Sequence, residues 1–234
     1  MNKYNGFSLI EMAIALAIIG FLIGGLLQPM SSTINYNKIK YTDVTLEQIK
    51  EALVSFAIIN NRLPCPAKCS KYNGKDIDCF NGVYDASDVG KETTDSVFCE
   101  QEGYLPWADL GVGRYDGWDE PFYYRVDKNY STILSGNELL KTDSSKKLTV
   151  KYKQTNKNLT ALETIGGTDY SRVIAIILSY GKNRKAESSN KITAANDATY
   201  VQGNYIENIF DDRVTWLSKY TLTNYLAKTR DLPQ

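Results

Sequence analysis

The first part of the chain holds a long apolar run with one charged side chain in it. The run extends over 21 residues from Phe7 to Leu27, and Glu11 is its only charged residue. As an α-helix it would be about 31 Å long, close to the hydrocarbon thickness of a bilayer. The pattern therefore predicts a transmembrane helix over residues 7–27.

A second helical pattern follows the apolar run. Gln28 and Pro29 follow the run, and we expect a kink at Pro29 because a proline inside a helix removes a backbone hydrogen bond. Thr45 is placed to cap the segment beyond, in which apolar residues recur three and four positions apart. We predict that residues 28–63 form the amphipathic second half of one long helix, whose apolar stripe needs a sheet or other helices to cover it. The stripe consists of Leu46, Ile49, Leu53 and Phe56.

Residues 64–234 have the pattern of a globular domain with a β-sheet. The strongest strand signal is the apolar run 173–180, which predicts a central strand buried on both faces. Residues 181–204 are polar and are predicted to form a long mobile connection. The expected fold class is α+β, with a long N-terminal transmembrane helix packed on an antiparallel β-sheet and a disulfide-bonded loop region. Shorter strands are predicted at 122–126, 148–152 and 213–217, and a terminal helix at 219–228.

All four cysteines lie in one loop-rich stretch, at Cys65, Cys69, Cys79 and Cys99. An even, clustered set after a membrane-targeting segment indicates two disulfides in an oxidising compartment. The alternative is a four-cysteine zinc site, but only Cys65 and Cys69 have the spacing of a zinc knuckle. Four cysteines allow three connectivities, of which we expect the nested one, Cys65–Cys99 and Cys69–Cys79.

The composition narrows the classes of function. The chain has 27 basic and 27 acidic side chains, so its net charge of zero does not indicate a nucleic-acid partner. It has no histidine, which removes the commonest general base, the Ser–His and Cys–His pairs and every imidazole zinc site. We therefore expect no enzyme and no cofactor. An enzyme would need a cleft with perturbed carboxylates, such as Asp116 or Asp119.

Glu11 needs a positively charged partner. A carboxylate inside a transmembrane helix costs about 2–3 kcal/mol, and an unpaired charge is untenable at low dielectric. No other residue of the apolar run can supply the cation. Cleavage of the chain between Gly6 and Phe7 would place the new α-ammonium of Phe7 one helical turn from Glu11. A neutralising pair would then become possible.

The N-terminal stretch resembles that of type IV pilins and type II secretion pseudopilins. The resemblance rests on a short leader with Lys3, then Gly6, an aromatic residue at Phe7 and the acid Glu11 before an apolar helix. An ordinary secretory signal peptide would place its apolar stretch before the cleavage site. The resemblance implies that a prepilin peptidase removes residues 1–6 and methylates the new amine of Phe7.

The resemblance also implies a location and partners. The processed protein would be a single-pass protein of the bacterial inner membrane, with residues 64–234 in the periplasm. An assembly platform in that membrane would add it to a pilus or pseudopilus filament of pilin or pseudopilin subunits. Glu11 would there pair with the N-terminal amine of a neighbouring subunit. The size of the domain favours a minor pilin or pseudopilin with a structural role. A pilus-tip adhesin or a DNA-uptake subunit with the same anchor is the alternative.

One feature of the related proteins has only a partial counterpart in this chain. Major pseudopilins of the calcium-binding kind carry a compact acidic loop near the C-terminus, where this chain offers only Asp211 and Asp212. These two residues can equally belong to a turn or a strand cap. We therefore predict no metal site. If the chain does bind calcium, Asp211 and Asp212 are the candidate ligands.

Overall fold

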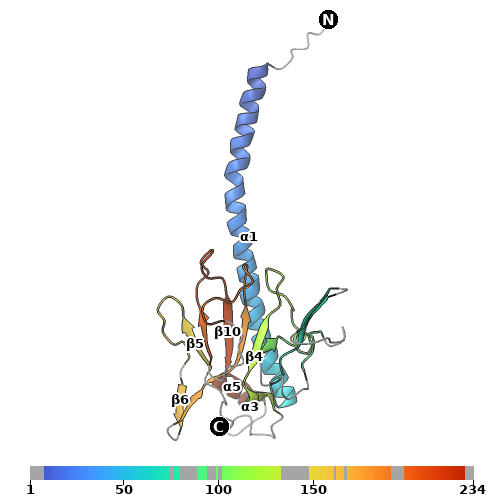
Figure 1. Ribbon diagram of the computed structural model, residues 1–234, viewed down its shortest axis with the longest axis vertical. Helices are drawn as coiled ribbons and strands as arrows, with labels where there is room; N and C mark the ends of the chain where they lie inside the picture. Colours follow the sequence, from blue (N-terminus) through green and yellow to red (C-terminus); the bar gives the residue numbers. More distant parts are fainter. Residues whose placement is uncertain are drawn as a thin grey trace. The chain divides into compact units, whose positions relative to one another are not determined.

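The structure is a computed structural model of the 234-residue chain (Figure 1). The chain divides into two compact units, Met1–Lys40 and Tyr41–Gln234. The expected cleavage site between Gly6 and Phe7 lies outside the described residues. The structure describes residues 8–73, 76–79, 89–93, 99, 102–132, 148–160, 162–165, 168–190 and 198–229.

One helix, α1 (Leu9–Asn60), contains residues of both units and is 52 residues long. It continues through Pro29 as a single element, and the kink expected at that residue stays a prediction. Asn61, with φ of 56°, follows the last helical residue and has the left-handed conformation that ends many helices.

Thr45 does not cap a helix, so that prediction is wrong. It lies inside α1, and its hydroxyl donates a hydrogen bond to the carbonyl oxygen of Tyr41 at 2.9 Å. A threonine inside a helix can bond to the carbonyl four residues earlier in this way. The residues before Thr45 are therefore already helical, and no cap is needed there.

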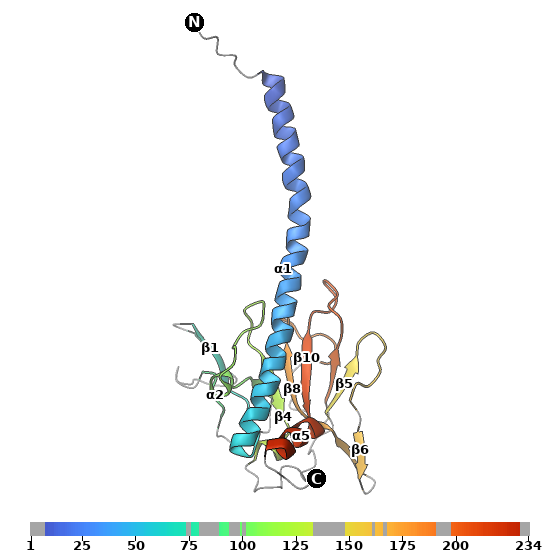
Figure 2. The ribbon, with the colours of Figure 1, turned by 180° about the vertical axis from the view of Figure 1, so that it is seen from behind.

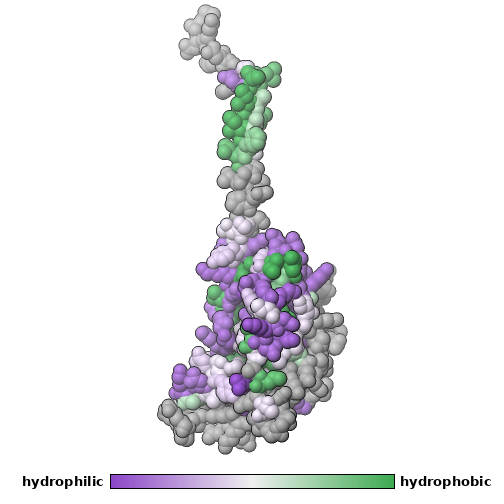
Figure 3. Space-filling model, turned by 90° about the vertical axis from the view of Figure 1, so that its left-hand side faces the viewer, coloured by the Kyte–Doolittle hydropathy of each residue, from purple (hydrophilic) through white to green (hydrophobic). Residues whose placement is uncertain are grey.

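In the first unit, the described part of α1 exposes its apolar side chains to solvent, and Figure 3 shows them in green. A helix that is apolar on all sides needs another apolar environment to bury it. Within the described residues, we find no helix that is both long and apolar enough to cross a membrane. The transmembrane helix predicted for residues 7–27 is therefore not confirmed. The side chains that are half or more exposed are Leu9, Ile10, Met12, Ile14, Leu16, Ile18, Ile19, Phe21, Leu22 and Ile23.

The second unit is built on a four-stranded antiparallel sheet with the order β10-β8-β4-β3. Every residue of β8 (Val173–Ser179) is buried, which confirms the predicted central strand. Its neighbours are β10 (Arg213–Ser218) and β4 (Tyr123–Val126), and β3 (Gly103–Tyr104) pairs with β4. The α+β class and the antiparallel sheet are therefore as predicted.

One face of the sheet packs against the last turns of α1 and against α5 (Lys219–Thr229), as Figure 2 shows from behind. Leu46, Ile49 and Leu53 on α1 are at most 3% exposed, and they share one core with Ile177 of β8. Three residues of the predicted apolar stripe are thus covered by the sheet, whereas Phe56, its fourth member, is half-buried and lies outside this core.

The other face of the sheet is covered by two parallel strands, β5 (Leu148–Tyr152) and β9 (Ala198–Gln202). Tyr200 of β9 is 1% exposed and packs with Ile176 of β8. The prediction of a long connection over 181–204 is therefore wrong for residues 198–202. Pairing with β5, about fifty residues earlier, stabilises this short strand, and such a distant partner leaves no local signal.

Short strands and helices lie in the cysteine-containing region and in the other loops. These are β1 (Cys69–Asn73), β2 (Asp76–Cys79), α2 (Trp107–Leu110), α3 (Lys128–Ser131), β6 (Leu162–Ile165) and β7 (Thr168–Ser171). The strands form two antiparallel hairpins, β1-β2 and β6-β7.

The disulfide expected between Cys65 and Cys99 is present, with a Cα–Cα distance of 4.9 Å. This bond rules out the four-cysteine zinc site, because two of the four sulfur atoms are used. Cys69 and Cys79 lie directly opposite each other in the β1-β2 ladder. Their side chains lie outside the described part of the structure, so the inner disulfide stays a prediction.

Candidate functional site

The first candidate site is the start of α1, where Glu11 lies in the first helical turn. Its Oε2 accepts a hydrogen bond from the backbone N–H of Ser8 at 2.9 Å, and the hydroxyl oxygen of Ser8 accepts one from the N–H of Ile10 at 3.4 Å. Both bonds satisfy N–H groups that have no partner within the helix. The carboxylate is exposed, and it has no ion-pair partner among the described residues. Glu11 is thus held in the first turn of α1, and none of the residues that the structure describes supplies a cation to it.

The second candidate site is an acidic cluster in the second unit, formed by Glu187, Asp211 and Asp212. One carboxylate oxygen of each residue lies within 4.8 Å of the others. Glu187 belongs to the loop 181–190 after β8, and the two aspartates directly precede β10. The sequence pointed to Asp211 and Asp212 but not to Glu187. That residue stands in a polar loop, and only the pairing of β8 with β10 brings it to the aspartates.

Backbone and amide donors orient the three carboxylates. The N–H of Asn183 donates to Oδ2 of Asp211 at 2.8 Å, and its side-chain amide donates to Oε1 of Glu187 at 2.6 Å. Oδ2 of Asp212 accepts the N–H of Glu187 at 2.8 Å and the side-chain amide of Asn190 at 2.9 Å. Oε2 of Glu187 accepts the N–H of Asp211 at 2.7 Å. Each carboxylate therefore has a fixed orientation.

Within the described residues, the Oδ1 atom of each aspartate has no hydrogen-bond donor. Asp211 is 5% exposed and Asp212 is 1% exposed, and their Oδ1 atoms are buried with no hydrogen-bond partner among the described residues. Burial raises the pKa of Asp211 from 3.8 to about 6 and that of Asp212 from 3.8 to about 7, and the charge of Glu187 acts in the same direction.

Gly181 allows the loop 181–190 to approach the aspartates. Its φ is +61°, and a Cβ atom at this position would lie 2.4 Å from the carbonyl oxygen of Asp211. A side chain there would meet both a steric clash and an unfavourable backbone conformation. Glycine is thus required where the loop passes Asp211.

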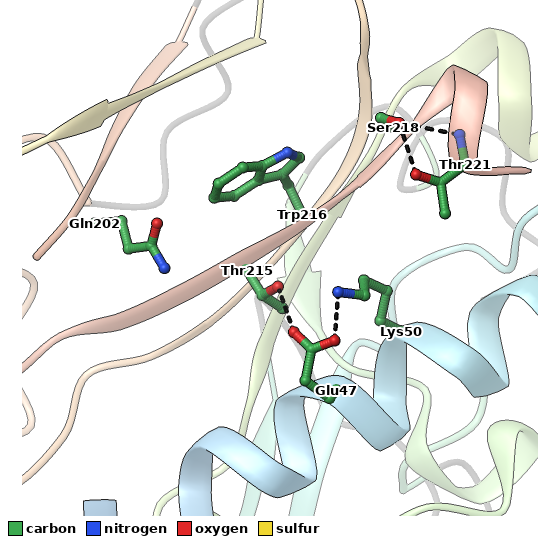
Figure 4. A pocket seen from close by; sticks show the side chains of 7 residues that line it. All are labelled: Glu47, Lys50, Gln202, Thr215, Trp216, Ser218 and Thr221. Carbon is green, nitrogen blue, oxygen red and sulfur yellow. Dashed lines mark hydrogen bonds and ion pairs between the residues drawn. The ribbon is translucent and has the colours of Figure 1, made fainter. Parts of the chain in front are cut away.

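A shallow pocket of about 290 Å³ lies between α1, β9, β10 and the start of α5 (Figure 4). Its charged groups neutralise each other, since the carboxylate of Glu47 forms an ion pair with Lys50 and accepts the hydroxyl of Thr215 at 3.4 Å. The lining residues combine this ion pair with three hydroxyl groups and the indole ring of Trp216. They are Glu47, Lys50, Gln202, Thr215, Trp216, Ser218 and Thr221.

Asp116 is one of the two carboxylates that the sequence offered for an enzyme. It is buried, and hydrogen bonds hold both of its oxygens. Its Oδ1 accepts the N–H groups of Trp118 and Glu120 at 2.8 and 2.9 Å, and its Oδ2 accepts the hydroxyl of Ser179 at 2.6 Å. Burial raises the pKa of this carboxyl. Asp119 is exposed and does not line the pocket. The two carboxylates therefore do not meet in a described cleft.

The comparison with known families matches the N-terminal segment of the chain. Residues 1–27 match the family model of the prokaryotic N-terminal methylation motif, the signature of type IV pilins and pseudopilins. No curated protein and no solved structure matches the chain. The resemblance identified from Gly6, Phe7 and Glu11 is thus confirmed for this segment. It supports processing of the chain in the manner of a prepilin.

Proposed function

We propose that this chain, which carries the type IV pilin signature at its N-terminus, is a structural subunit of a type IV pilus or a type II secretion filament. The observation that supports the proposal is the match of residues 1–27 to the methylation motif, with Glu11 in the expected place. The large domain after the helix favours a minor pilin or pseudopilin.

Glu11 is the assembly residue in this proposal. In the uncut chain its carboxylate accepts the N–H of Ser8 and has no described cationic partner. Removal of residues 1–6 creates an α-ammonium at Phe7, next to Ser8. In an apolar environment, a single charge is strongly destabilising unless an opposite charge pairs with it. The amine of a neighbouring subunit would therefore select Glu11 and set the register of the subunits.

The apolar residues at the start of α1 provide the packing surface. Ten of the described residues between Leu9 and Ile23 carry large apolar side chains that are half or more exposed. Burial of apolar surface stabilises association by about 25 cal/mol per Å². Helices of neighbouring subunits, and the inner membrane before assembly, would cover these side chains. The partners are thus other pilin or pseudopilin subunits, the prepilin peptidase and the assembly platform.

Mass spectrometry of the mature protein from its natural host tests this proposal. We expect an N-terminus at Phe7 that carries one methyl group. An intact N-terminus at Met1, in cells with an active prepilin peptidase, would overturn the assignment. The chain expressed in cells without the peptidase is the control and should keep residues 1–6.

Deletion of the gene separates the kinds of filament. Loss of surface fibres with normal protein secretion supports a pilus, and loss of secretion with normal fibres supports a pseudopilus. If the fibres stay intact while adhesion or DNA uptake is lost, the tip-subunit alternative replaces the structural one.

A further inference from the structure

We propose that the pocket between α1, β9, β10 and the start of α5 binds one neutral sugar ring in its pyranose form. The ring can belong to a free sugar or to a glycan. All residues that line the pocket lie in the second unit, so the proposal does not depend on the function of the N-terminal segment. The size of the pocket, its aromatic ring, its polar groups and its charge balance support the proposal.

The size of the pocket suits a ligand of one ring. Its volume of about 290 Å³ lies at the lower end of the range for ligand pockets, which is about 300–1,000 Å³. The pocket lies at β10, the edge strand of the sheet, and Figure 4 shows Trp216 and Gln202 on one side of this strand and Glu47 and Lys50 of α1 on the other. A ligand at this edge would contact both the helix and the strands.

Trp216 supplies a fixed aromatic surface. Its ring packs against the core that contains Tyr200 and Val214, and it stays partly exposed where it lines the pocket. The face of an aromatic ring is electron-rich. The C–H groups of a sugar ring carry a partial positive charge because their carbon atoms bear oxygen, so one face of the sugar is attracted to the indole. Since the core already holds the ring, binding orders no further side chain here.

The amide of Gln202 is available for the hydroxyl groups of a ligand. It carries donors and an acceptor, and among the described residues its side chain forms no hydrogen bond. The hydroxyls of Ser218 and Thr221 bond to each other at 2.8 Å, which uses one of their two protons and leaves the other for a ligand. Sugar hydroxyls both donate and accept, so they match this mixed set of groups.

The charge balance of the pocket favours a neutral ligand. Glu47 and Lys50 form an ion pair with each other, so the pocket has no excess of either sign. A phosphate or a carboxylate would approach the carboxylate of Glu47, and an ammonium group would approach Lys50. Both arrangements add a repulsion that a sugar avoids. The pocket is therefore less suited to a nucleotide, although a base could stack on Trp216.

Saturation-transfer NMR of the purified full-length protein, in a detergent that carries no sugar headgroup, tests the site. The probes are glucose, galactose, mannose and N-acetylglucosamine. We expect at least one of them to bind with a dissociation constant of about 1–10 mM, as the affinity per atom of small ligands implies. The ring C–H protons should give the strongest signals. The absence of saturable binding of all four sugars, up to ten times the upper limit of that range, would overturn the proposal.

Two further probes identify the source of the ring and test a rival ligand. The α- and β-methyl glycosides of the sugar that binds imitate its link in a glycan. Binding of one of them like the free sugar supports a glycan residue, and loss of binding for both supports a free sugar. A short thymidine oligonucleotide tests stacking of bases on Trp216. If the oligonucleotide binds and none of the sugars does, the site is a nucleic-acid site and the proposal is wrong.

Two substitutions in the pocket locate the bound sugar. Gln202→Ala removes the free amide and should weaken binding about three- to tenfold, which is the contribution of one hydrogen bond. Trp216→Leu removes the aromatic face, keeps an apolar side chain against the core and should weaken binding at least fivefold. Because Trp216 also packs on the core, urea unfolding checks that this variant is folded, and Gln202→Ala tests the site without a change in the core. Unchanged binding in Gln202→Ala and in folded Trp216→Leu would overturn the proposal.

The matched controls lie outside the pocket. Asn204→Ala removes an exposed amide two residues after Gln202, and Tyr225→Leu removes an aromatic ring that is 45% exposed on α5. Both variants should bind the sugar like the wild type. If they weaken binding as much as the pocket variants do, the sugar associates with the surface in general, and the proposed site is wrong.

Discussion

Arg213 of β10 binds Asp43 of α1 through two parallel hydrogen bonds, from Nε to Oδ1 at 2.7 Å and from Nη2 to Oδ2 at 2.8 Å. The guanidinium also donates to the carbonyl oxygen of Gly203 at 3.1 Å. These bonds connect the helix, the edge strand of the sheet and the segment after β9. Such two-pronged pairs are stronger and better defined than single ion pairs.

We expect Asp43→Asn to lower the free energy of unfolding by about 1 kcal/mol, because one of the two charged bonds is lost at a partly exposed site. Urea unfolding followed by tryptophan fluorescence measures the change. Glu51→Gln, the same kind of change at an exposed position of the same helix, is the control and should alter the stability by less than about half of that amount. Equal effects of the two substitutions would show that the pair with Arg213 adds nothing.

Gly181→Ala should destabilise the second unit strongly. The new Cβ would lie 2.4 Å from the carbonyl oxygen of Asp211, and the residue has a positive φ. We expect a loss of about 2–4 kcal/mol in urea unfolding. Gly111→Ala separates the two causes, because Gly111 has a φ of +65° but its Cβ would meet no atom within 4 Å. That control should lose only about 1 kcal/mol. The same loss in both variants would contradict the close contact at Asp211.

Asp116 should make the stability depend on pH. Burial raises the pKa of this carboxyl above 3.8 in the folded protein, so the folded state binds the proton more tightly than the unfolded state does. The charged form is thus unfavourable at neutral pH, and the penalty decreases as the pH falls through the folded-state pKa towards 3.8. Relative to Asp116→Asn, the wild type should therefore gain stability between pH 7 and pH 4. Parallel pH profiles of the two proteins in denaturant unfolding would contradict this assignment.

Cys69 and Cys79 should form the second disulfide. Residues directly opposite each other in an antiparallel ladder have Cα atoms about 4.5–5.5 Å apart, a separation that a disulfide can bridge. Proteolytic digestion without reductant, followed by mass spectrometry, should yield one peptide pair linked through Cys69 and Cys79. The pair linked through Cys65 and Cys99 is the internal control in the same digest. Free thiols at Cys69 and Cys79 next to an intact control pair would refute the prediction.

Glu11→Gln should separate assembly from processing. The amide can still accept the hydrogen bond from Ser8, but it cannot pair with an ammonium group. We expect normal cleavage and methylation at Phe7 and at least a tenfold reduction in assembled filaments, measured by mass spectrometry and by immunoblotting of sheared filaments. Ser8→Ala, which removes only the hydroxyl that accepts from Ile10, should assemble normally. Normal filaments in Glu11→Gln would contradict the charge-pairing proposal.

Much of the fold was predictable because its signals are local. The continuous apolar run of β8 predicted a strand buried on both faces, and the spacing of Leu46, Ile49 and Leu53 predicted a helix with one buried side. These patterns reflect the periods of strands and helices, which depend only on neighbouring residues. Strand β9 was missed because its polar neighbours carry no such pattern and its partner β5 is distant in the sequence.

The candidate sites also differ in how much of each could be predicted from local sequence. The N-terminal motif is continuous in sequence, so Gly6, Phe7 and Glu11 were identified from the residues alone, and the comparison confirmed the segment that contains them. The need of Glu11 for a cation also followed from the sequence, because a single charge in an apolar run is visible without a structure. The Cys65–Cys99 pairing was one of three connectivities, and the structure selected it.

Only the tertiary structure decided what surrounds Asp211 and Asp212. The sequence leaves the role of this adjacent pair open. The third carboxylate, Glu187, is distant along the chain, and the burial of the pair leaves no local signal. The antiparallel pairing of β8 with β10 brings Glu187 to the two aspartates, and the packed loop removes their Oδ1 atoms from water. The sequence by itself thus determined the helix, the central strand and the N-terminal motif, all of which depend on neighbouring residues. The acidic cluster required the folded chain, because carboxylates more than twenty residues apart interact only when the sheet places them together.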